Sequence, residues 1–230
     1  SAMAYVGDDK VLLYGGAGDI EDPFNTSMND TWVYDLSDNT WTLKNPASNP
    51  GSRWNHAMAS FGGDQVLLFG GLSASNDTWV YDLSADTWTL KNPVTSPPFI
   101  GTQGPGLSSI GGDKVVLFGG DFFSQDTWVY DLSDNNWTLK NPSIKPPARW
   151  IGRMASLGGD RVLLFGGWAP DSGDPYLGDT WVYDLGDDSW TLKNPSANPS
   201  ARVGHAMASI GSNKVLLSGG DYSIYDTWLY

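Results

Sequence analysis

The chain of 230 residues contains no cysteine and a single glutamate, Glu21. The absence of cysteine excludes a disulfide framework and a metal site built from thiolates. Glutamate favours helices whereas aspartate favours turns, so a chain whose acids are almost all aspartate is expected to be rich in turns. The 28 glycines and 14 prolines weaken a helical interpretation further.

Charged residues and long apolar runs are also scarce. Only 17% of the residues are charged, and the net charge is −13. An acidic surface repels phosphate groups, so nucleic acid and anionic membranes are not expected as partners. No apolar run is long enough to span a membrane, and no signal peptide is visible. A chain without cysteine fits secreted prokaryotic proteins, and it also fits many proteins in other locations. We expect an extracellular or cell-surface location in a prokaryote.

The sequence is dominated by a repeated phrase. Residues 30–46 read DTWVYDLSDNTWTLKNP. The phrase returns almost unchanged at residues 77–93, 126–142 and 179–195, and its first part, DTWLY, occupies residues 226–230. The chain is therefore expected to be an array of similar structural units.

Each unit predicts four short antiparallel strands. A second phrase, AMAYVGDDKVLLYGG at residues 2–16, pairs a small-residue strand with an apolar strand through a Gly/Asp turn. The Asp-Thr-Trp phrase adds a third strand, a polar turn and a fourth strand that ends at Asn-Pro. The third-strand tryptophans are spaced by 47, 49, 53 and 47 residues, at Trp32, Trp79, Trp128, Trp181 and Trp228. A period of roughly 50 residues with four strands is typical of a β-propeller blade, in which tryptophans pack between neighbouring blades.

Three features of the repeat together carry a family resemblance. A glycine pair follows the apolar strand, an aromatic-x-Tyr-Asp segment comes next, and a second tryptophan lies nine residues after the first. The glycine pairs are Gly15-Gly16, Gly70-Gly71, Gly119-Gly120, Gly166-Gly167 and Gly219-Gly220. This pattern covers essentially the whole chain and resembles the Kelch repeat.

The resemblance implies an all-β fold, namely a β-propeller of five four-stranded Kelch-type blades in which the last blade lacks its outer strand. The single domain would span residues 1–230. Its blades would cover residues 1–46, 47–93, 94–142, 143–195 and 196–230. Kelch propellers more often have six or seven blades, so either five blades close or the chain belongs to a longer array. The family includes protein-binding adaptors, oxidases and carbohydrate-acting enzymes, so the fold alone does not assign a function.

The copies differ from one another at one end of the strands. The first-to-second and third-to-fourth connections are constant in length, whereas the second-to-third connections contain 13, 5, 5, 11 and 5 residues. The fourth-to-first connections vary in sequence, at residues 47–55, 94–104, 143–151 and 196–204. In an antiparallel meander both variable kinds of connection lie at the same end, which we call the variable face. Loops that a rigid scaffold positions commonly carry binding residues.

Aromatic and cationic residues concentrate on the variable face, and such residues are enriched at binding hot spots. The candidate ligand-binding residues are Arg53, Trp54, His56, Arg149, Trp150, Arg153, Trp168, Arg202, His205, Phe122 and Tyr222. Innermost first strands, which the resemblance implies, would place the arginines around the mouth of a central channel. The alternative is that Arg53, Arg149 and Arg202 pair with a loop aspartate or a backbone carbonyl inside the fold. The two histidines are interpreted as structural or channel-lining.

Three functional hypotheses follow. Catalytic and phosphate-binding motifs are absent from the sequence, so we expect no catalysis, no cofactor and no metal site. The favoured hypothesis is an interaction module that binds a protein, or a glycan or carboxylate ligand, through the variable face. The alternatives are a designed, recently amplified or excised scaffold with no selected ligand, and a carbohydrate-acting Kelch-type enzyme. The unpaired edge of the last blade predicts self-association.

Overall fold

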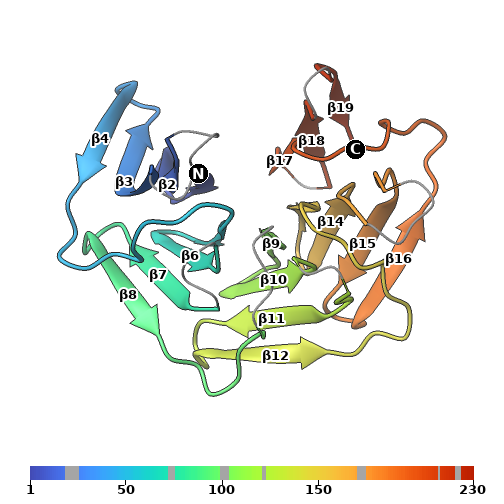
Figure 1. The fold of residues 1–230 in the computed structure, drawn as a ribbon, viewed down its shortest axis with the longest axis horizontal. Coiled ribbons are helices and arrows are strands. Elements are labelled where there is room, and N and C mark those ends of the chain that lie inside the picture. Colours follow the sequence, from blue (N-terminus) through green and yellow to red (C-terminus); the bar gives the residue numbers. More distant parts are fainter. Residues whose placement is uncertain are drawn as a thin grey trace. The chain divides into compact units, whose positions relative to one another are not determined.

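The computed structural model describes residues 1–18, 26–71, 76–98, 104–120, 123–169, 175–211, 213–220 and 224–230. These residues form strands, turns and bends (Figure 1). In this part of the chain there is no helix of the length and apolar character needed to cross a membrane. The candidate residues Phe122 and Tyr222 lie outside the described residues.

The described residues form five antiparallel sheets, one for each repeat. The first consists of β1 (Ala2–Tyr5), β2 (Lys10–Ala17), β3 (Ser27–Asp35) and β4 (Thr40–Lys44), and the second of β5 (Ala57–Gly62), β6 (Gln65–Phe69), β7 (Thr78–Asp82) and β8 (Thr87–Lys91). The third consists of β9 (Gly106–Ser109), β10 (Lys114–Phe118), β11 (Thr127–Asp131) and β12 (Asn136–Lys140). The fourth consists of β13 (Arg153–Gly158), β14 (Arg161–Phe165), β15 (Thr180–Asp184) and β16 (Ser189–Lys193), and the fifth of β17 (Ala206–Ser209), β18 (Val215–Ser218) and β19 (Thr227–Leu229).

The spatial order of the strands follows their order in the chain in every sheet. Each sheet is therefore a meander, with its first and third turns at one end and its other connections at the opposite end. Within each blade, we call that opposite end, which carries the connections of the variable face, the variable edge. The fold class is confirmed: the protein is all-β and consists of five Kelch-type propeller blades, and the fifth blade has three strands among the described residues.

The constant turn between the third and fourth strands is formed in the same way in four blades. One asparagine or aspartate in each turn has a positive φ, which these two residue types tolerate better than most others. These residues are Asn39, Asp86, Asn135 and Asp188, with φ of 58°, 49°, 49° and 47°. Each also accepts a hydrogen bond of 2.6–2.7 Å from the tyrosine five residues earlier, at Tyr34, Tyr81, Tyr130 and Tyr183. The polar side chains of this edge thus stabilise the turn.

The chain forms two compact units, residues 1–104 with 130–137 and residues 105–129 with 138–230. In the first unit, apolar residues of blade 1 such as Leu12 and Val33 are buried against Val66 and Leu68 of blade 2. In the second unit, one buried cluster joins blade 3 to blade 4 and another joins blade 4 to blade 5. First strands of neighbouring blades contact each other within each unit, as β1 with β5 and β13 with β17.

A fourth-strand tryptophan locks each of three blades to the blade before it. Its indole N–H donates to the threonine of the preceding Asp-Thr-Trp phrase, and its ring packs edge-on against a second-strand aromatic residue. The hydrogen bonds join Trp88 to Thr31, Trp137 to Thr78 and Trp190 to Thr127, at 3.0, 2.9 and 2.9 Å. The aromatic pairs are Tyr14–Trp88, Phe69–Trp137 and Phe118–Trp190, with ring centroids 5.0–5.1 Å apart. We call the threonine and its aromatic neighbour a tryptophan socket.

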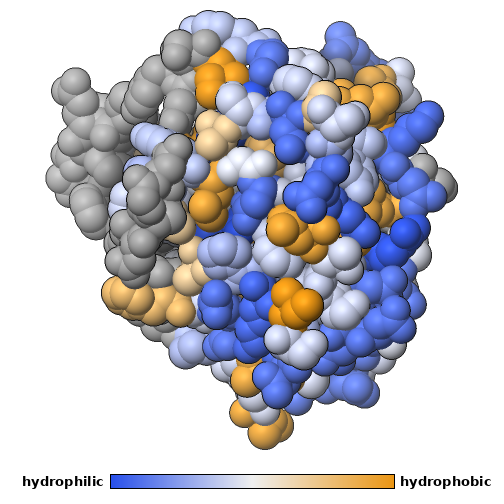
Figure 2. Space-filling view, turned by 90° about the vertical axis from the view of Figure 1, so that its right-hand side faces the viewer, coloured by the Kyte–Doolittle hydropathy of each residue, from blue (hydrophilic) through white to orange (hydrophobic). Residues whose placement is uncertain are grey.

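The side of the molecule shown in Figure 2 is mostly hydrophilic, with its apolar side chains in separate patches. Exposed leucines at equivalent fourth-strand positions, such as Leu139 and Leu192, are one source of such apolar surface. Isolated exposed apolar residues are ordinary on a folded protein, so they do not by themselves mark a binding site.

Candidate binding surface

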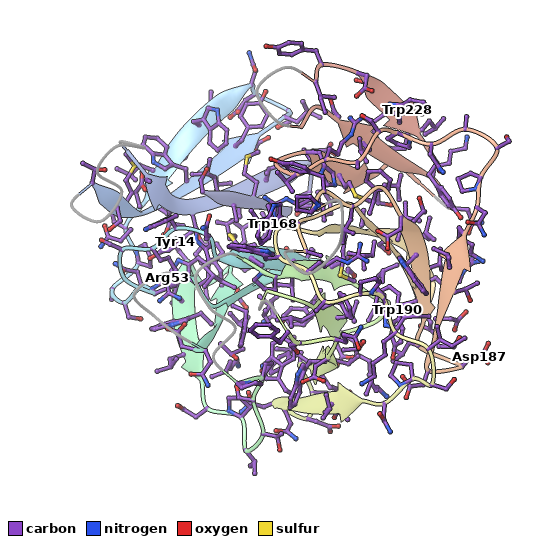
Figure 3. All side chains as sticks on the ribbon, turned by 45° about the vertical axis from the view of Figure 1, so that its right-hand side comes forward. Tyr14, Arg53, Trp168, Asp187, Trp190 and Trp228 are labelled. Atoms are coloured by element: carbon purple, nitrogen blue, oxygen red, sulfur yellow. The ribbon has the colours of Figure 1, made fainter. Side chains whose placement is uncertain are left out.

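Three of the candidate arginines are buried and paired inside the fold. Arg53, Arg149 and Arg202 are 0–1% exposed. The two terminal nitrogens of Arg149 donate to the two carboxylate oxygens of Asp179, each at 2.7 Å, and one of them also donates to the carbonyl of Gly166 at 3.0 Å. Arg53, labelled in Figure 3, makes the same two-pronged pair with Asp77, at 2.8 and 3.0 Å. Arg202 pairs with Asp226 in the same way.

Each of these arginines also holds the blade before it through its backbone. The carbonyl of Arg53 accepts from the N–H of Gly16, and that of Arg149 accepts from Gly120, at 2.9 and 3.0 Å. A side chain at Gly119, where φ is +73°, would collide with the carbonyl of Arg149. This close approach gives a physical reason for the glycine pair at the end of the second strand. One arginine residue thus connects a glycine pair of one blade to the aspartate of the next.

Two of the aspartate partners, Asp179 and Asp226, have pKa values below the usual value of an aspartate. Burial alone would raise the pKa of Asp179, but hydrogen bonds and charge from Arg149 outweigh it, and the pKa lies below its usual value. Hydrogen bonds from Arg202 and Trp228 hold the pKa of Asp226 at about 2. Asp179 and Asp226 therefore stay charged near neutral pH. The interaction predicted as the alternative, an arginine bound to a loop aspartate and a carbonyl, is what the structure contains, and a surface ligand cannot reach these guanidinium groups without opening the blade.

Both candidate histidines are buried beside aromatic rings. His56 packs edge-on against Tyr14, with ring centroids 5.7 Å apart, and His205 packs against Phe165 at 5.6 Å. Burial is the largest cause that lowers the pKa of each to about 3. The positive charge of Arg53 adds to this shift at His56. The imidazoles are therefore neutral at physiological pH and serve as packing groups rather than as proton donors.

This burial predicts a loss of stability in mild acid. The pKa of about 3 in the folded chain lies below the value of about 6.5 expected in the unfolded chain. The unfolded chain then binds more protons between these values, so the free energy of unfolding falls as the pH falls below about 6.5. At pH 5.5 each histidine is expected to cost about 1.4 kcal/mol relative to neutral pH.

Urea unfolding at pH 7.5 and pH 5.5 measures this loss, with a His56→Gln, His205→Gln double variant as the control. The wild-type chain should lose clearly more stability than the double variant across this window. Most carboxylates remain charged above pH 5, so the histidines are the groups expected to titrate in this window. Equal losses of stability in the two proteins would show instead that other groups cause the loss.

Two tryptophans of blade 4, Trp150 and Trp168, form a partly exposed aromatic cluster on its variable edge. Trp150 and Trp168 exchange backbone hydrogen bonds of 3.1 and 2.9 Å, and their rings meet edge-on with centroids 4.6 Å apart. An isolated β-bridge also joins Trp168 to Tyr176, which is 42% exposed. Two separate variable connections therefore form one aromatic surface, whose central residue is labelled in Figure 3.

The remaining candidates lie in different surroundings. Arg153 begins β13, and its Nε donates to the carbonyl of His205 at 3.2 Å, while burial lowers the pKa of its guanidinium. Trp54 is half-buried in the first unit, in the connection between blades 1 and 2. In the described part of the chain, no group of three or more acidic or histidine residues is placed to hold a metal ion.

Sequence reasoning missed the aspartates that bind the arginines. Asp77, Asp179 and Asp226 all begin the Asp-Thr-Trp phrase, and this shared register was the available signal. Their distance in sequence from the arginines, 24 or 30 residues, concealed the pairing. Tyr176, in a variable connection of blade 4, was also not among the residues selected from the sequence.

Comparison with known proteins agrees with this architecture. A family model described as the KLHDC2/KLHL20/DRC7 Kelch-repeats domain matches residues 1–167 and 108–230. Putative adagio-like protein 2 from Oryza sativa subsp. japonica is 40% identical over 65 residues, which are 27% of this chain and 10% of that protein. Adagio-like protein 1 from the same plant is 38% identical over a segment of the same extent. The chain thus matches only about a tenth of the length of these two relatives. From the matched repeats and the five blades, the chain belongs to the family of Kelch-repeat domains.

Proposed function

We propose that the chain is a protein-binding module that recognises its partner through the variable edge of its blades. Kelch propellers generally bind protein partners, and the sequence contains no recognised catalytic motif. The alternatives of a glycan ligand, of a scaffold without a selected ligand and of a carbohydrate-acting enzyme are outcomes that the experiment below separates.

The observation that carries the proposal is the aromatic cluster of Trp150, Trp168 and Tyr176. The three residues come from variable connections, are partly exposed, and are joined to one another by backbone bridges. Tryptophan and tyrosine provide much of the contact energy at protein interfaces, because they bury large areas at a small entropic cost. The polar side chains at the opposite edge, such as Asp188, are engaged in turn hydrogen bonds.

A peptide-display library and a glycan array, each probed with the labelled chain, test this proposal. We expect peptide ligands whose affinity falls by roughly tenfold or more in Trp168→Ala, because a central interface aromatic contributes at least about 1.4 kcal/mol. The matched control is Asp187→Ala, at the constant turn of blade 4 (Figure 3). This change should leave affinity within about twofold, and circular dichroism should show that both variants remain folded.

Three results would contradict the proposal. Ligands found only on the glycan array would favour the carbohydrate alternatives. Peptide ligands that are lost in the Asp187 variant but retained in the Trp168 variant would place recognition at the constant edge. No ligand on either array would favour a scaffold without a selected partner.

A further inference from the structure

Blade 3 lacks the arginine that binds the aspartate of the Asp-Thr-Trp phrase in blades 2, 4 and 5. In those blades the residue two positions after the arginine has a positive φ, and the corresponding residue of blade 3 is Gly104, with φ of 68°. The others are Asn55, Ile151 and Gly204, with φ of 57°, 56° and 69°. The arginine register of blade 3 therefore falls on Thr102, which lies outside the described residues, and the sequence contains no arginine from residue 54 to residue 148.

The groups that accept hydrogen bonds from these arginines also exist in blade 3. In blades 2, 4 and 5 the arginine donates to both carboxylate oxygens of the aspartate and to the carbonyl of the first glycine in the glycine pair. The distances to this carbonyl are 2.9–3.0 Å. Blade 3 has Asp126 and Gly119 at these positions, and φ of Gly119 is 73°, close to the 63–70° of the other three glycines. We call the carboxylate of Asp126 and the carbonyl of Gly119 the acceptor site of blade 3.

The carboxylate of Asp126 has no ion-pair or hydrogen-bond partner among the described residues, although its backbone N–H donates to the hydroxyl of Ser124 at 3.2 Å. In blades 2, 4 and 5 the tryptophan two residues after the aspartate also donates its indole N–H to the carboxylate, at 2.7 Å. The corresponding Trp128 makes no such bond in the described part of the chain. Asp126 is partly exposed and follows the exposed Gln125, so a side chain from another molecule can reach it.

A guanidinium group matches the acceptor site in charge and in shape. It presents a planar pair of N–H donors to two carboxylate oxygens at once, which the ammonium group of lysine cannot do. Blade 4 shows that the aspartate and glycine of this repeat accept such a fork, because Arg149 binds both oxygens of Asp179 and the carbonyl of Gly166. The net charge of −13 also favours the approach of a cationic ligand.

The acceptor site is connected through the backbone to the aromatic cluster of blade 4. The N–H of Gly120, the second glycine of the pair, donates to the carbonyl of Arg149 at 3.0 Å, and Trp150 is the next residue in the chain. Both features lie at variable connections of neighbouring blades, and their residues belong to the second compact unit. A single protein partner can therefore contact both.

We propose that the acceptor site of blade 3 binds an arginine side chain supplied by the protein partner. Two N–H groups of its guanidinium donate to the two oxygens of Asp126, and a third donates to the carbonyl of Gly119. The inference rests on the proposed function for the source of the arginine, and it adds the chemistry that the partner must present. The acceptor site itself can be tested with a small molecule that carries the same side chain.

An NMR titration of the isotope-labelled full chain with acetyl-arginine amide measures binding at this site. The indole N–H signal of Trp128 should shift saturably, with a Kd of roughly 1–10 mM, as expected for a single charge-assisted fork. The signal of Trp181 should not move, because its aspartate already binds Arg149. Acetyl-citrulline amide, which has the same shape but no charge, should bind at least about tenfold more weakly.

Two variants that each remove one charge show whether Asp126 binds the probe. Asp126→Asn should weaken binding at least about tenfold, because an amide cannot replace a carboxylate in the fork. Asp134→Asn removes a charge from the exposed constant turn of the same blade, so it should leave affinity within about twofold. Absence of a saturable shift, equal binding of the citrulline probe, or equal losses in the two variants would each overturn the proposal.

A Trp168→Ala chain separates this site from the aromatic cluster. It should bind the arginine probe with unchanged affinity, because the cluster takes no part in the fork. Loss of probe binding in this variant would contradict the proposal. If the display library yields no peptide while the probe still binds at Asp126, the proposed function is wrong but the acceptor site is confirmed.

Restoring the arginine within the chain gives a second test. A Thr102→Arg chain should have a higher urea midpoint than the parent and should no longer bind the probe, because its own guanidinium binds the acceptor site. Adding Asp126→Asn to this variant should remove the gain in stability. Retained probe binding or an unchanged urea midpoint in the Thr102→Arg chain would count against the proposal.

Discussion

An Arg149→Ala variant is expected to lose about 3–5 kcal/mol of unfolding free energy, the range for breaking a buried ion pair by removing one partner. The side chain makes four hydrogen bonds, to both carboxylate oxygens of Asp179 and to the carbonyls of Pro147 and Gly166. Its removal leaves the carboxylate without its compensating charge and leaves two carbonyls without their donor. Loss of contacts made by the stem of the side chain adds to the effect.

Two further variants show whether the effect depends on the geometry of the guanidinium group and on its burial. Arg149→Lys keeps the charge but cannot reproduce the planar fork that binds two carboxylate oxygens, so it should recover little of the loss. Arg161→Ala is the control, because this arginine is exposed at a constant turn and binds only the side chain of Asn213 among the described residues. Its cost should be below about 1 kcal/mol.

Equilibrium urea unfolding at pH 7 measures all three variants. If Arg149→Ala were no more costly than Arg161→Ala, the arginine–aspartate pair would contribute no more than a surface contact. The interpretation of these arginines as connectors between blades would then fail. A double-mutant cycle with Asp179→Ala would give the coupling energy of the pair directly.

The repeated phrases predicted the fold because they repeat the physical causes of each element. The apolar Val-Leu-Leu-Phe type of strand needs cover on both faces, and packed blades provide that cover. The polar turn with asparagine or aspartate at one position fixes the third-to-fourth connection. Strand boundaries also follow from the sequence, since Asn-Pro ends the fourth strand in each complete copy.

The site was harder to predict because it depends on which side chains meet across blades. Sequence register shows that Arg53, Arg149 and Arg202 are equivalent, but it does not show where their side chains point. The same register is compatible with a cationic channel mouth and with buried pairing. The structure distinguishes these, since the guanidinium groups lie against carbonyls of the glycine pairs.

The aromatic cluster shows a second limit of prediction from the sequence. Trp150 and Trp168 belong to connections on opposite sides of β13 and β14 in the sequence, and a backbone bridge brings them together. Variable loops have no repeated copy to compare, so no internal pattern predicts such a bridge. Topology assigns residues such as Trp150 to a face, but it does not identify the residues that they contact.

The four fourth-strand tryptophans look alike in sequence, but their exposure differs. Trp88 is 2% exposed, whereas Trp41 is 47% exposed. Trp88 donates to Thr31 and packs against the rings of Tyr14 and Tyr81. For Trp41 the ring contact is with Tyr34 of its own blade. The difference arises from the neighbouring blade, which a repeat viewed alone does not contain.

A Trp88→Ala variant should therefore lose about 3–5 kcal/mol of unfolding free energy, because it empties a buried socket. Trp41→Ala makes the same chemical change in the same unit and should lose only about 1 kcal/mol, the value of one partly exposed aromatic pair. Thr31→Val should lose about 1 kcal/mol, as expected for one hydrogen bond to Trp88. Urea unfolding followed by circular dichroism measures all three without relying on the tryptophans themselves. Equal losses for Trp88→Ala and Trp41→Ala would mean that the socket contributes no stability beyond packing within one blade. The arginine pairs alone would then have to hold each blade to the preceding one.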